Sequence, residues 1–366
     1  MLPLKSIFAL LPLLAPCHAA PTKRCSSAIS SFDDVDDALS SGCDITINSI
    51  TVPSGQALDL SGLESGVKVT VAGNVTFEGG QEWEGPMFII DGDDVTFDGA
   101  GHTFDGQGET YWDGKGSNGG KTKPKFMKVK MSGTFSNLIV KNSPVQAFSI
   151  GNKEPLLLTG VTVNNRDGDE LGSDGKALGH NSDCFDVSAV SATLDGNFCY
   201  NQDDCLAINY GSGITFSNNY CSGGHGISIG SVKSGKHISD IKMTGNTVVG
   251  STNGLRIKTI AGATDGSVIG VTYSGNNVQA TQYGIVIQQD YENGSPTGKP
   301  TNGIEIRDIN FTDGNTVEVE GDKAQQVYVL CGDGSCTGTW DWSGLSVSGG
   351  LKGNITGNPP ITGFSL

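Results

Sequence analysis

Three short motifs carry acidic and basic side chains at spacings that favour one shared site. Asp183, Asp204 and His225 follow one another at equal intervals, and Asp203 directly precedes Asp204. Each of the three equally spaced residues lies two positions before a pair of apolar residues that are themselves two apart. If each interval is one turn of a repeating coil, the three carboxylates and the imidazole stack along one side of the molecule.

These residue types suit the hydrolysis of a glycosidic bond. That reaction needs one protonated acid for the leaving oxygen and one carboxylate to activate water or attack carbon. Crowded carboxylates raise one another's pKa, which keeps a proton available. In the next segment, Arg256 and Lys258 alternate with apolar residues and so share the outward face, where they could bind an anionic group on a sugar. The sequence therefore predicts a site for an acidic carbohydrate.

The elements that must position these residues are short parallel strands repeated coil by coil. Side chains two apart share one face of a strand, so a series of apolar pairs can fill one core: Phe148/Ile150, Phe185/Val187, Leu206/Ile208, Ile227/Ile229, Leu255/Ile257 and Ile285/Ile287. Segments that repeat irregularly, about 20–35 residues apart, indicate a solenoid. Asparagines that recur at strand ends fit a side-chain ladder at the turns of a parallel β-helix.

The charged residues cannot continue this inward face, because a buried unpaired charge is very costly. We therefore expect Asp183, Asp204 and His225 at the bends that enter successive strands, aimed outward. A lone aspartate in such a fold is usually a turn residue that bonds its own backbone, and we interpret Asp186 and Asp195 in this way.

Composition excludes several other classes of protein. Glycine accounts for 54 of the 366 residues, and 39 acidic residues against 23 Lys and Arg give a net charge of −16. Nucleic-acid binding would need a basic face, and collagen would need a strict three-residue glycine period. Long helical bundles are disfavoured because glycine weakens helix interiors. A turn-rich all-β protein remains.

The N-terminal segment is typical of a secreted protein. Residues 1–20 have the positive start, apolar run and small-residue exit of a signal peptide. Residues 21–24 would form a short propeptide that ends in a dibasic site. Residues 25–366 show no composition break and are interpreted as a single β-helix catalytic domain. We expect secretion and no membrane contact once the signal is removed.

A short helix and several disulfides should stabilise this domain. Apolar residues three or four apart within residues 26–42 predict a helix that covers the N-terminal end of the core. Eight cysteines remain after the signal leaves, and an oxidising compartment favours disulfides. Local loops suggest the pairs Cys25–Cys43, Cys205–Cys221 and Cys331–Cys336, while Cys184 and Cys199 are left either paired or free. Three N-x-Thr sequons offer glycosylation sites: Asn74, Asn310 and Asn354.

The motifs together resemble the fungal endopolygalacturonases of glycoside hydrolase family 28. Four of them match in order, followed by a tyrosine: Asn181-Ser182-Asp183, Gln202-Asp203-Asp204, Gly224-His225-Gly226, Arg256-Ile257-Lys258 and Tyr291. The resemblance implies a right-handed parallel β-helix that hydrolyses α-1,4 bonds of de-esterified pectin with inversion, without metal or cofactor.

The resemblance also implies a role for each matching residue. Asp204 would be the general acid, Asp183 and Asp203 would activate water, and His225 would maintain the protonation of the acid. Substrate would be bound by Arg256, Lys258 and Tyr291, with Asn181 and Gln288 as further sugar contacts. One departure from the family pattern is the segment SVKSGKH, which carries Lys233 and Lys236 where a glycine-rich stretch is expected.

Other functions on the same scaffold stay open at this point. They are an exo-polygalacturonase or rhamnogalacturonan hydrolase, a calcium-dependent pectate lyase, and a carbohydrate-binding solenoid without catalysis. The expected partner is polygalacturonate, and we expect no binding of nucleic acid. The resemblance is consistent with a monomer and raises a plant inhibitor protein as a further partner.

Overall fold

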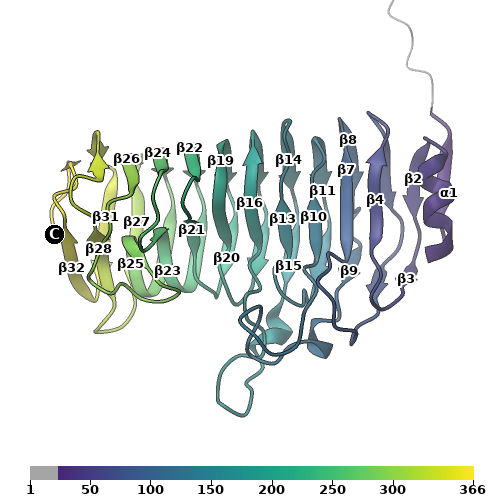
Figure 1. The fold of residues 1–366 in the computed structure, drawn as a ribbon, viewed down its shortest axis with the longest axis horizontal. Helices are drawn as coiled ribbons and strands as arrows, with labels where there is room; N and C mark the ends of the chain where they lie inside the picture. The colour runs from purple at the N-terminus through teal and green to yellow at the C-terminus, as the bar shows by residue number, and fades with distance from the viewer. Residues whose placement is uncertain (1–23) are drawn as a thin grey trace, which may run out of the picture.

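The computed structural model describes residues 24–366, which form one stack of parallel strands (Figure 1). The predicted signal peptide and residues 21–23 of the predicted propeptide lie outside the described residues. Each coil contributes strands to three ladders that run along the long axis of the molecule. This is the predicted right-handed parallel β-helix. Across residues 24–366 no helix has the length and apolar character needed to cross a membrane.

One ladder carries the candidate site residues and is called the site ladder. Its strands are β4 (Leu58–Leu63), β7 (Phe88–Gly92), β10 (Met127–Val129), β13 (Phe148–Ile150), β16 (Phe185–Val190), β19 (Leu206–Ser217), β21 (Ile227–Val232), β23 (Thr247–Ile260), β25 (Asn277–Tyr291), β28 (Gln325–Leu330) and β32 (Leu351–Thr356).

The second ladder follows the site ladder along each coil, and the long strand β19 belongs to both. Its other strands are β1 (Ser26–Ile29), β2 (Asp44–Ile47), β5 (Lys68–Val71), β8 (Val95–Asp98), β11 (Gly133–Ser136), β14 (Leu156–Thr159), β17 (Ala192–Asp195), β22 (His237–Thr244), β24 (Gly266–Ser274), β26 (Ile304–Thr312) and β29 (Cys336–Thr337).

The third ladder completes each coil and shares the long strands β23 and β25 with the site ladder. Its other strands are β3 (Ile50–Val52), β6 (Val75–Phe77), β9 (Thr103–Asp105), β12 (Ile139–Lys141), β15 (Thr162–Asn164), β18 (Phe198–Tyr200), β20 (Tyr220–Ser222), β27 (Asn315–Val319) and β31 (Leu345–Gly349). The segment that leads from a third-ladder strand to the next site-ladder strand is called the entry bend.

The bends between the second and third ladders hold the asparagine ladder that the sequence predicts. The side-chain amide of Asn197 donates to Asn219, Asn219 to Asn246, Asn246 to Asn276 and Asn276 to Asn315, over distances of 2.9, 3.1, 2.9 and 2.8 Å. All five side chains are buried. Buried polar groups are costly unless they are hydrogen-bonded, so this continuous chain fixes the spacing of successive coils.

The predicted N-terminal helix is present but shorter than residues 26–42. A 3₁₀ turn, η1 (Phe32–Asp34), leads into α1 (Val35–Ser40) at the N-terminal end of the stack (Figure 1). The prediction is wrong for Ile29, which lies in β1 and pairs with Ile47 of β2. Pairing within the parallel ladder outweighs the local helical spacing there. Two further 3₁₀ turns, η2 (Gly108–Thr110) and η3 (Arg166–Asp169), lie in connecting loops.

Four disulfides join the described cysteines. They are the three predicted pairs, Cys25–Cys43, Cys205–Cys221 and Cys331–Cys336, together with Cys184–Cys199, which the sequence left open. Cys199 and Cys221 are neighbours on β18 and β20. Two disulfides therefore tie the entry bends behind Asp183 and Asp204 to the third ladder.

The C-terminal end of the stack is closed by large aromatic side chains. Trp340 and Trp342 are fully buried, and β30 (Trp340–Asp341) pairs with the final short strand β33 (Ile361–Thr362). The ring of Phe364 packs against that of Trp342. Both ends of the long apolar core are thus covered.

Candidate active site

The strand register brings the predicted site residues onto adjacent coils. Phe185, Leu206, Ile227 and Leu255 occupy one position on successive site-ladder strands, and all four are buried. The next inward residue of each strand, two positions on, is in register as well. This confirms the predicted inward face, with one coil for each step from Phe185 to Leu206 and from Leu206 to Ile227.

The carboxylates and the histidine lie on the entry bends of three successive coils. Asp183 precedes β16, Asp203 and Asp204 precede β19, and His225 precedes β21. Backbone hydrogen bonds join these bends: the Cys184 N–H donates to the Asp204 carbonyl, and the His225 N–H to the Asp203 carbonyl, both at 2.9 Å. Neighbouring strands of a sheet lie about 4.8 Å apart, so the side chains come close enough to act on one bond.

Asp204 is held by three side chains from the next two coils. Its Oδ1 accepts hydrogen bonds from Ser228 Oγ and Arg256 Nη2, and its Oδ2 accepts one from Lys258 Nζ, each at 2.8 Å. The Asp204 residue is only 1% exposed. Both oxygens of the carboxylate are therefore engaged by hydrogen-bond donors, two of which are cationic side chains.

Asp203 and His225 form a second hydrogen-bonded pair. His225 Nδ1 lies 2.9 Å from Asp203 Oδ1, and the Asn181 amide donates to Asp203 Oδ2 at 3.2 Å. Burial alone would raise the pKa of Asp203, but the hydrogen bond and charge of His225 lower it to about 2. Burial lowers the pKa of His225, and Asp203 more than offsets this, so that pKa lies above 6.5. In the free protein this pair holds its proton on the imidazole.

The pKa values of Asp183 and Asp186 are raised, whereas that of Asp203 is lowered. Burial, followed by the charges of Asp203 and Asp186, raises the pKa of Asp183 well above 3.8. Burial and the nearby Asp204 raise the pKa of Asp186 to about 6. Among the hydrogen bonds of the described residues, none involves the Asp183 side chain. Its carboxyl oxygens are therefore free to bind a ligand or a water molecule.

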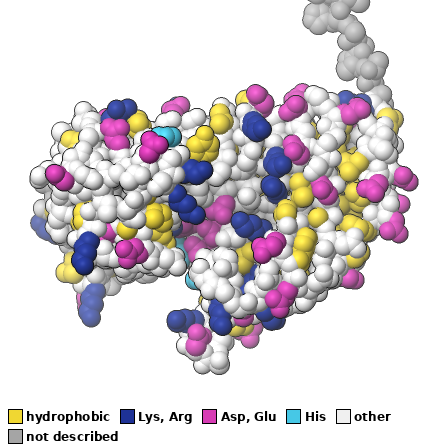
Figure 2. Space-filling model, viewed as in Figure 1, with side chains coloured by type: hydrophobic (Ala, Val, Ile, Leu, Met, Phe, Trp, Pro, Cys, Tyr) yellow, Lys and Arg dark blue, Asp and Glu magenta, His cyan; other side chains and the backbone are white. Residues whose placement is uncertain are grey.

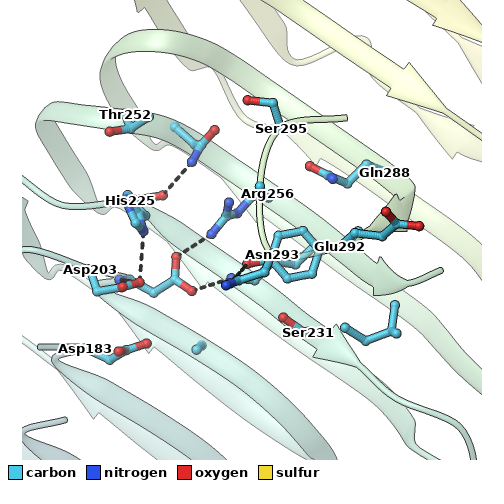
Figure 3. A pocket seen from close by; sticks show the side chains of 18 of the residues that line it. Asp183, Asp203, His225, Ser231, Thr252, Arg256, Gln288, Glu292, Asn293 and Ser295 are labelled. Atoms are coloured by element: carbon cyan, nitrogen blue, oxygen red, sulfur yellow. Dashed lines mark hydrogen bonds and ion pairs between the residues drawn. The ribbon is translucent and has the colours of Figure 1, made fainter. Parts of the chain in front are cut away.

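These groups lie in an open cleft of about 740 Å³. Figure 2 shows acidic side chains gathered in a hollow near the middle of the molecule, with basic side chains beside them. Figure 3 shows Asp183, Asp203, His225 and Arg256 arranged along neighbouring coils in this cleft. Its lining includes Asn118 and His180 and also the segment 291–296, which forms one rim of the cleft (Figure 3). A cleft open to solvent can admit an extended polymer.

The remaining predicted substrate contacts also line the cleft, in different ways. The Tyr291 ring lies 5.0 Å from Lys258 Nζ and 5.9 Å from the guanidinium carbon of Arg256. Gln288 is buried beside Lys258, and its Nε2 has no hydrogen-bond partner among residues 24–366. Asn181 uses its amide on Asp203 and accepts a hydrogen bond from the Ser117 N–H at 3.1 Å. Asn181 therefore links Asp203 to the loop that carries Ser117.

Three of these groups also have a spacing that could suit a metal ion. Asp203, Asp204 and His225 each offer a ligand atom, and these atoms lie within 4.8 Å of one another. However, the Asp204 oxygens already bind Arg256 and Lys258. A divalent cation would meet two buried positive charges there, which repel it. The donor set favours an anionic substrate over a cation.

The comparison with known families agrees with this geometry. The model of the family described as glycosyl hydrolases family 28 matches residues 43–363. The chain belongs to this family. A likeness to the polygalacturonase of Erwinia carotovora, at 20% identity and a TM-score of 0.63, reflects the shared fold alone.

Several relatives in family 28 are similar over nearly the whole chain. Endopolygalacturonase A of Aspergillus flavus is 47% identical over 349 residues, covering 93% of this chain and 92% of that protein. Endopolygalacturonase B of Aspergillus oryzae is 48% identical, covering 89% of this chain and 88% of that protein. The solved structure of endopolygalacturonase I from Stereum purpureum, complexed with two galacturonates, has a TM-score of 0.85 at 45% identity. It covers 92% of this chain and 98% of that one.

Two site residues of this family 28 chain escape the sequence reasoning. Ser228 accepts a hydrogen bond from Arg256 Nε at 3.1 Å and donates to Asp204. Ser228 lies between the inward residues Ile227 and Ile229 and so faces outward, in register with Arg256. This alternation could have identified it from the sequence. Asp186 was interpreted as a turn residue, and this is wrong. It lies within β16, between two inward side chains, and faces the cleft.

Proposed function

We propose that this family 28 chain is a secreted endo-polygalacturonase. It hydrolyses α-1,4 bonds between galacturonates in de-esterified pectin, with inversion at the anomeric carbon. The observation that carries the proposal is the cluster of three carboxylates on adjacent coils, joined to Arg256 and Lys258 in an open cleft. The high identity to proteins named endopolygalacturonases supports the same substrate.

We propose for Asp204 a role other than the general acid that the family resemblance implies. A general acid must point an O–H group at the leaving oxygen, whereas both Asp204 oxygens already accept hydrogen bonds from Ser228, Arg256 and Lys258. A carboxylate that is fixed in this way can orient an attacking water molecule. We therefore assign Asp204, together with Asp183, to the activation of water.

The proton for the leaving oxygen comes from the Asp203–His225 pair. A bound sugar displaces water from this pair, and loss of water disfavours the charged carboxylate and the charged imidazolium alike, which shifts the shared proton from His225 towards Asp203. Asp203 then protonates the glycosidic oxygen as its bond to the anomeric carbon breaks. Water attacks the opposite face of that carbon and gives its proton to Asp183 or Asp204. The part-exposed His225 can take up a new proton from solvent.

Five further side chains would contact the sugar, one of them weakly. Arg256 and Lys258 keep N–H donors beyond those used by Asp204 and can bind a galacturonate carboxylate. Tyr291 lies beside these two cations and can pack on or hydrogen-bond to a sugar ring. The unpartnered amide of Gln288 is a ready donor to a hydroxyl. Asn181 serves the site by orienting Asp203 and makes a weaker sugar contact.

The protein would act as a glycosylated monomer outside the cell. Asn74 and Asn354 are exposed and Asn310 is half-exposed, so all three sequons are accessible at the surface. The eight cysteines, all paired among the described residues, fit an oxidising compartment. A plant inhibitor protein that covers the cleft is the partner we would expect to limit its activity.

A time course of products from polygalacturonate, with and without a chelator, tests the function. An endo-acting hydrolase yields new reducing ends and oligomers of mixed length from the start, and a chelator leaves the rate unchanged. Release of monomers alone would indicate an exo-acting enzyme. An unsaturated product that disappears with chelator would indicate a lyase, and tight binding of pectate without cleavage would indicate a non-catalytic protein.

A further inference from the structure

The cleft holds more acidic than basic side chains, and most of its positive charge is already paired. The aspartates and glutamate that line it are Asp183, Asp186, Asp203, Asp204 and Glu292, and the lysines and arginine are Lys233, Arg256 and Lys258. Arg256 and Lys258 both bind Asp204 at 2.8 Å. Among the ion pairs of residues 24–366 none involves Lys233. An anionic chain in this cleft therefore meets one lysine whose charge is not already neutralised by a carboxylate.

Lys233 is held at the cleft by a fixed turn. It directly follows β21, whose last residue, Val232, pairs with Thr259 of β23. The Lys236 N–H donates to the Lys233 carbonyl at 3.2 Å and closes a tight turn. This turn is docked on the next coil, because the Gly235 N–H donates to the Thr264 carbonyl at 3.0 Å. The base of the lysine side chain is thus positioned before any ligand arrives.

The other lysine of the same turn has a different environment. Lys236 is also exposed, but it does not line the cleft. Its Nζ lies 5.3 Å from the centre of the Tyr210 ring, a cation–π contact on the outer surface. The two lysines carry the same charge three residues apart in one turn. The fold therefore separates a lysine that faces the cleft from one that does not.

We propose that Lys233 binds the carboxylate of a galacturonate remote from the scissile bond and so sets the preference for de-esterified substrate. This inference rests on the proposed function. The reacting sugar would use Arg256 and Lys258, and Lys233 would meet a further unit of the same chain. A methyl ester at that unit would remove the negative charge that the lysine attracts.

Lys233→Gln and the matched control Lys236→Gln test the proposal. We measure kcat and KM on polygalacturonate and on pectins of increasing methyl-esterification, at low and at high salt. Lys233→Gln should lower kcat/KM on polygalacturonate about three- to fivefold, the upper range for an exposed ion pair. The loss should lie mainly in KM, and it should shrink with methyl-esterification and with salt. Lys236→Gln should resemble the wild type.

The outcomes separate this inference from the proposed function. If the wild type does not cleave polygalacturonate at all, the proposed function itself fails. If the wild type is active and Lys233→Gln matches it on every substrate, the role of Lys233 is overturned. Equal losses in both lysine variants would also overturn it, because they would reflect the overall surface charge. Thermal melting of both variants checks that each is folded.

Discussion

The proton-transfer roles at the site depend on which cation each carboxylate faces. Asp204 faces the permanently charged Arg256 and also Lys258, whereas Asp203 faces His225, which can lose its proton. Two adjacent residues of one bend therefore differ in their chemistry, because side chains on later coils give each of them a different partner. The sequence could place both aspartates in the site, but it could not say which cation each one would face.

Replacing each carboxylate separates the acid from the water-activating groups. Asp203→Asn should slow hydrolysis of polygalacturonate by at least about 10²-fold, the lower range for general acid catalysis. On a dinitrophenyl oligogalacturonide, whose leaving group needs no proton, the same variant should recover most of its rate. Asp204→Asn and Asp183→Asn should stay slow on both substrates. Recovery in Asp204→Asn instead would return the acid role to that residue.

The pH dependence of kcat/KM should have an acidic limb set by Asp183 and an alkaline limb set by His225. The pKa of Asp183 is raised well above 3.8, so activity should rise with pH as this carboxyl loses its proton and can accept one from water. The pKa of His225 is raised above 6.5. Activity should fall as the pH rises through this raised pKa and the imidazole loses its proton. His225→Gln should abolish the alkaline limb. Persistence of that limb in the variant would contradict the assignment.

Among the elements, the segment after β25 depends on one buried carboxylate. Asp290 is fully buried, and its Oδ2 accepts hydrogen bonds from the Thr297 N–H at 2.6 Å, the Thr297 hydroxyl at 2.8 Å and the Gly298 N–H at 2.8 Å. These bonds close the segment that forms one rim of the cleft. Hydrogen bonds to a charged group contribute about 1.5–3 kcal/mol each to stability.

Asp290→Ala should therefore loosen this rim. We expect faster amide hydrogen exchange in residues 292–300 and a raised KM, with a smaller change in kcat because the carboxylates on the entry bends keep their partners. Asp59→Ala is the matched control, since Asp59 is exposed and, within the described part of the chain, its side chain accepts hydrogen bonds from Ser61 alone. Unchanged exchange in the rim of Asp290→Ala would show that Asp290 does not order it.

Sequence reasoning succeeded where the spacing of coils is regular. The step of one coil from Leu206 to Ile227 and the recurrent asparagines both follow the local repeat. The strand register and the asparagine ladder could therefore be predicted from the sequence. It was wrong where a tertiary contact overrides a local pattern, as in the pairing of Ile29 with Ile47. The pairing of Cys184 with Cys199 depends on the direction of a bend that spacing does not reveal.

For the whole molecule, a rigid apolar stack carries a site whose charges come from separate coils. The contact between Asp204 and Arg256 joins residues 52 apart in sequence, and only the closed register of the stack brings them together. The chain has a net charge of −16, so the attraction for an anionic polymer must be local. The paired and unpaired cations of the cleft supply that attraction.

The most direct test of the central claim is the anomeric form of the first product. Proton NMR can follow a defined α-1,4 oligogalacturonate in the presence of the protein, before the new reducing ends mutarotate. Attack by water on the opposite face of the anomeric carbon predicts that the β-anomer appears first. A first product in the α form, or an unsaturated sugar, would contradict the inverting hydrolase mechanism.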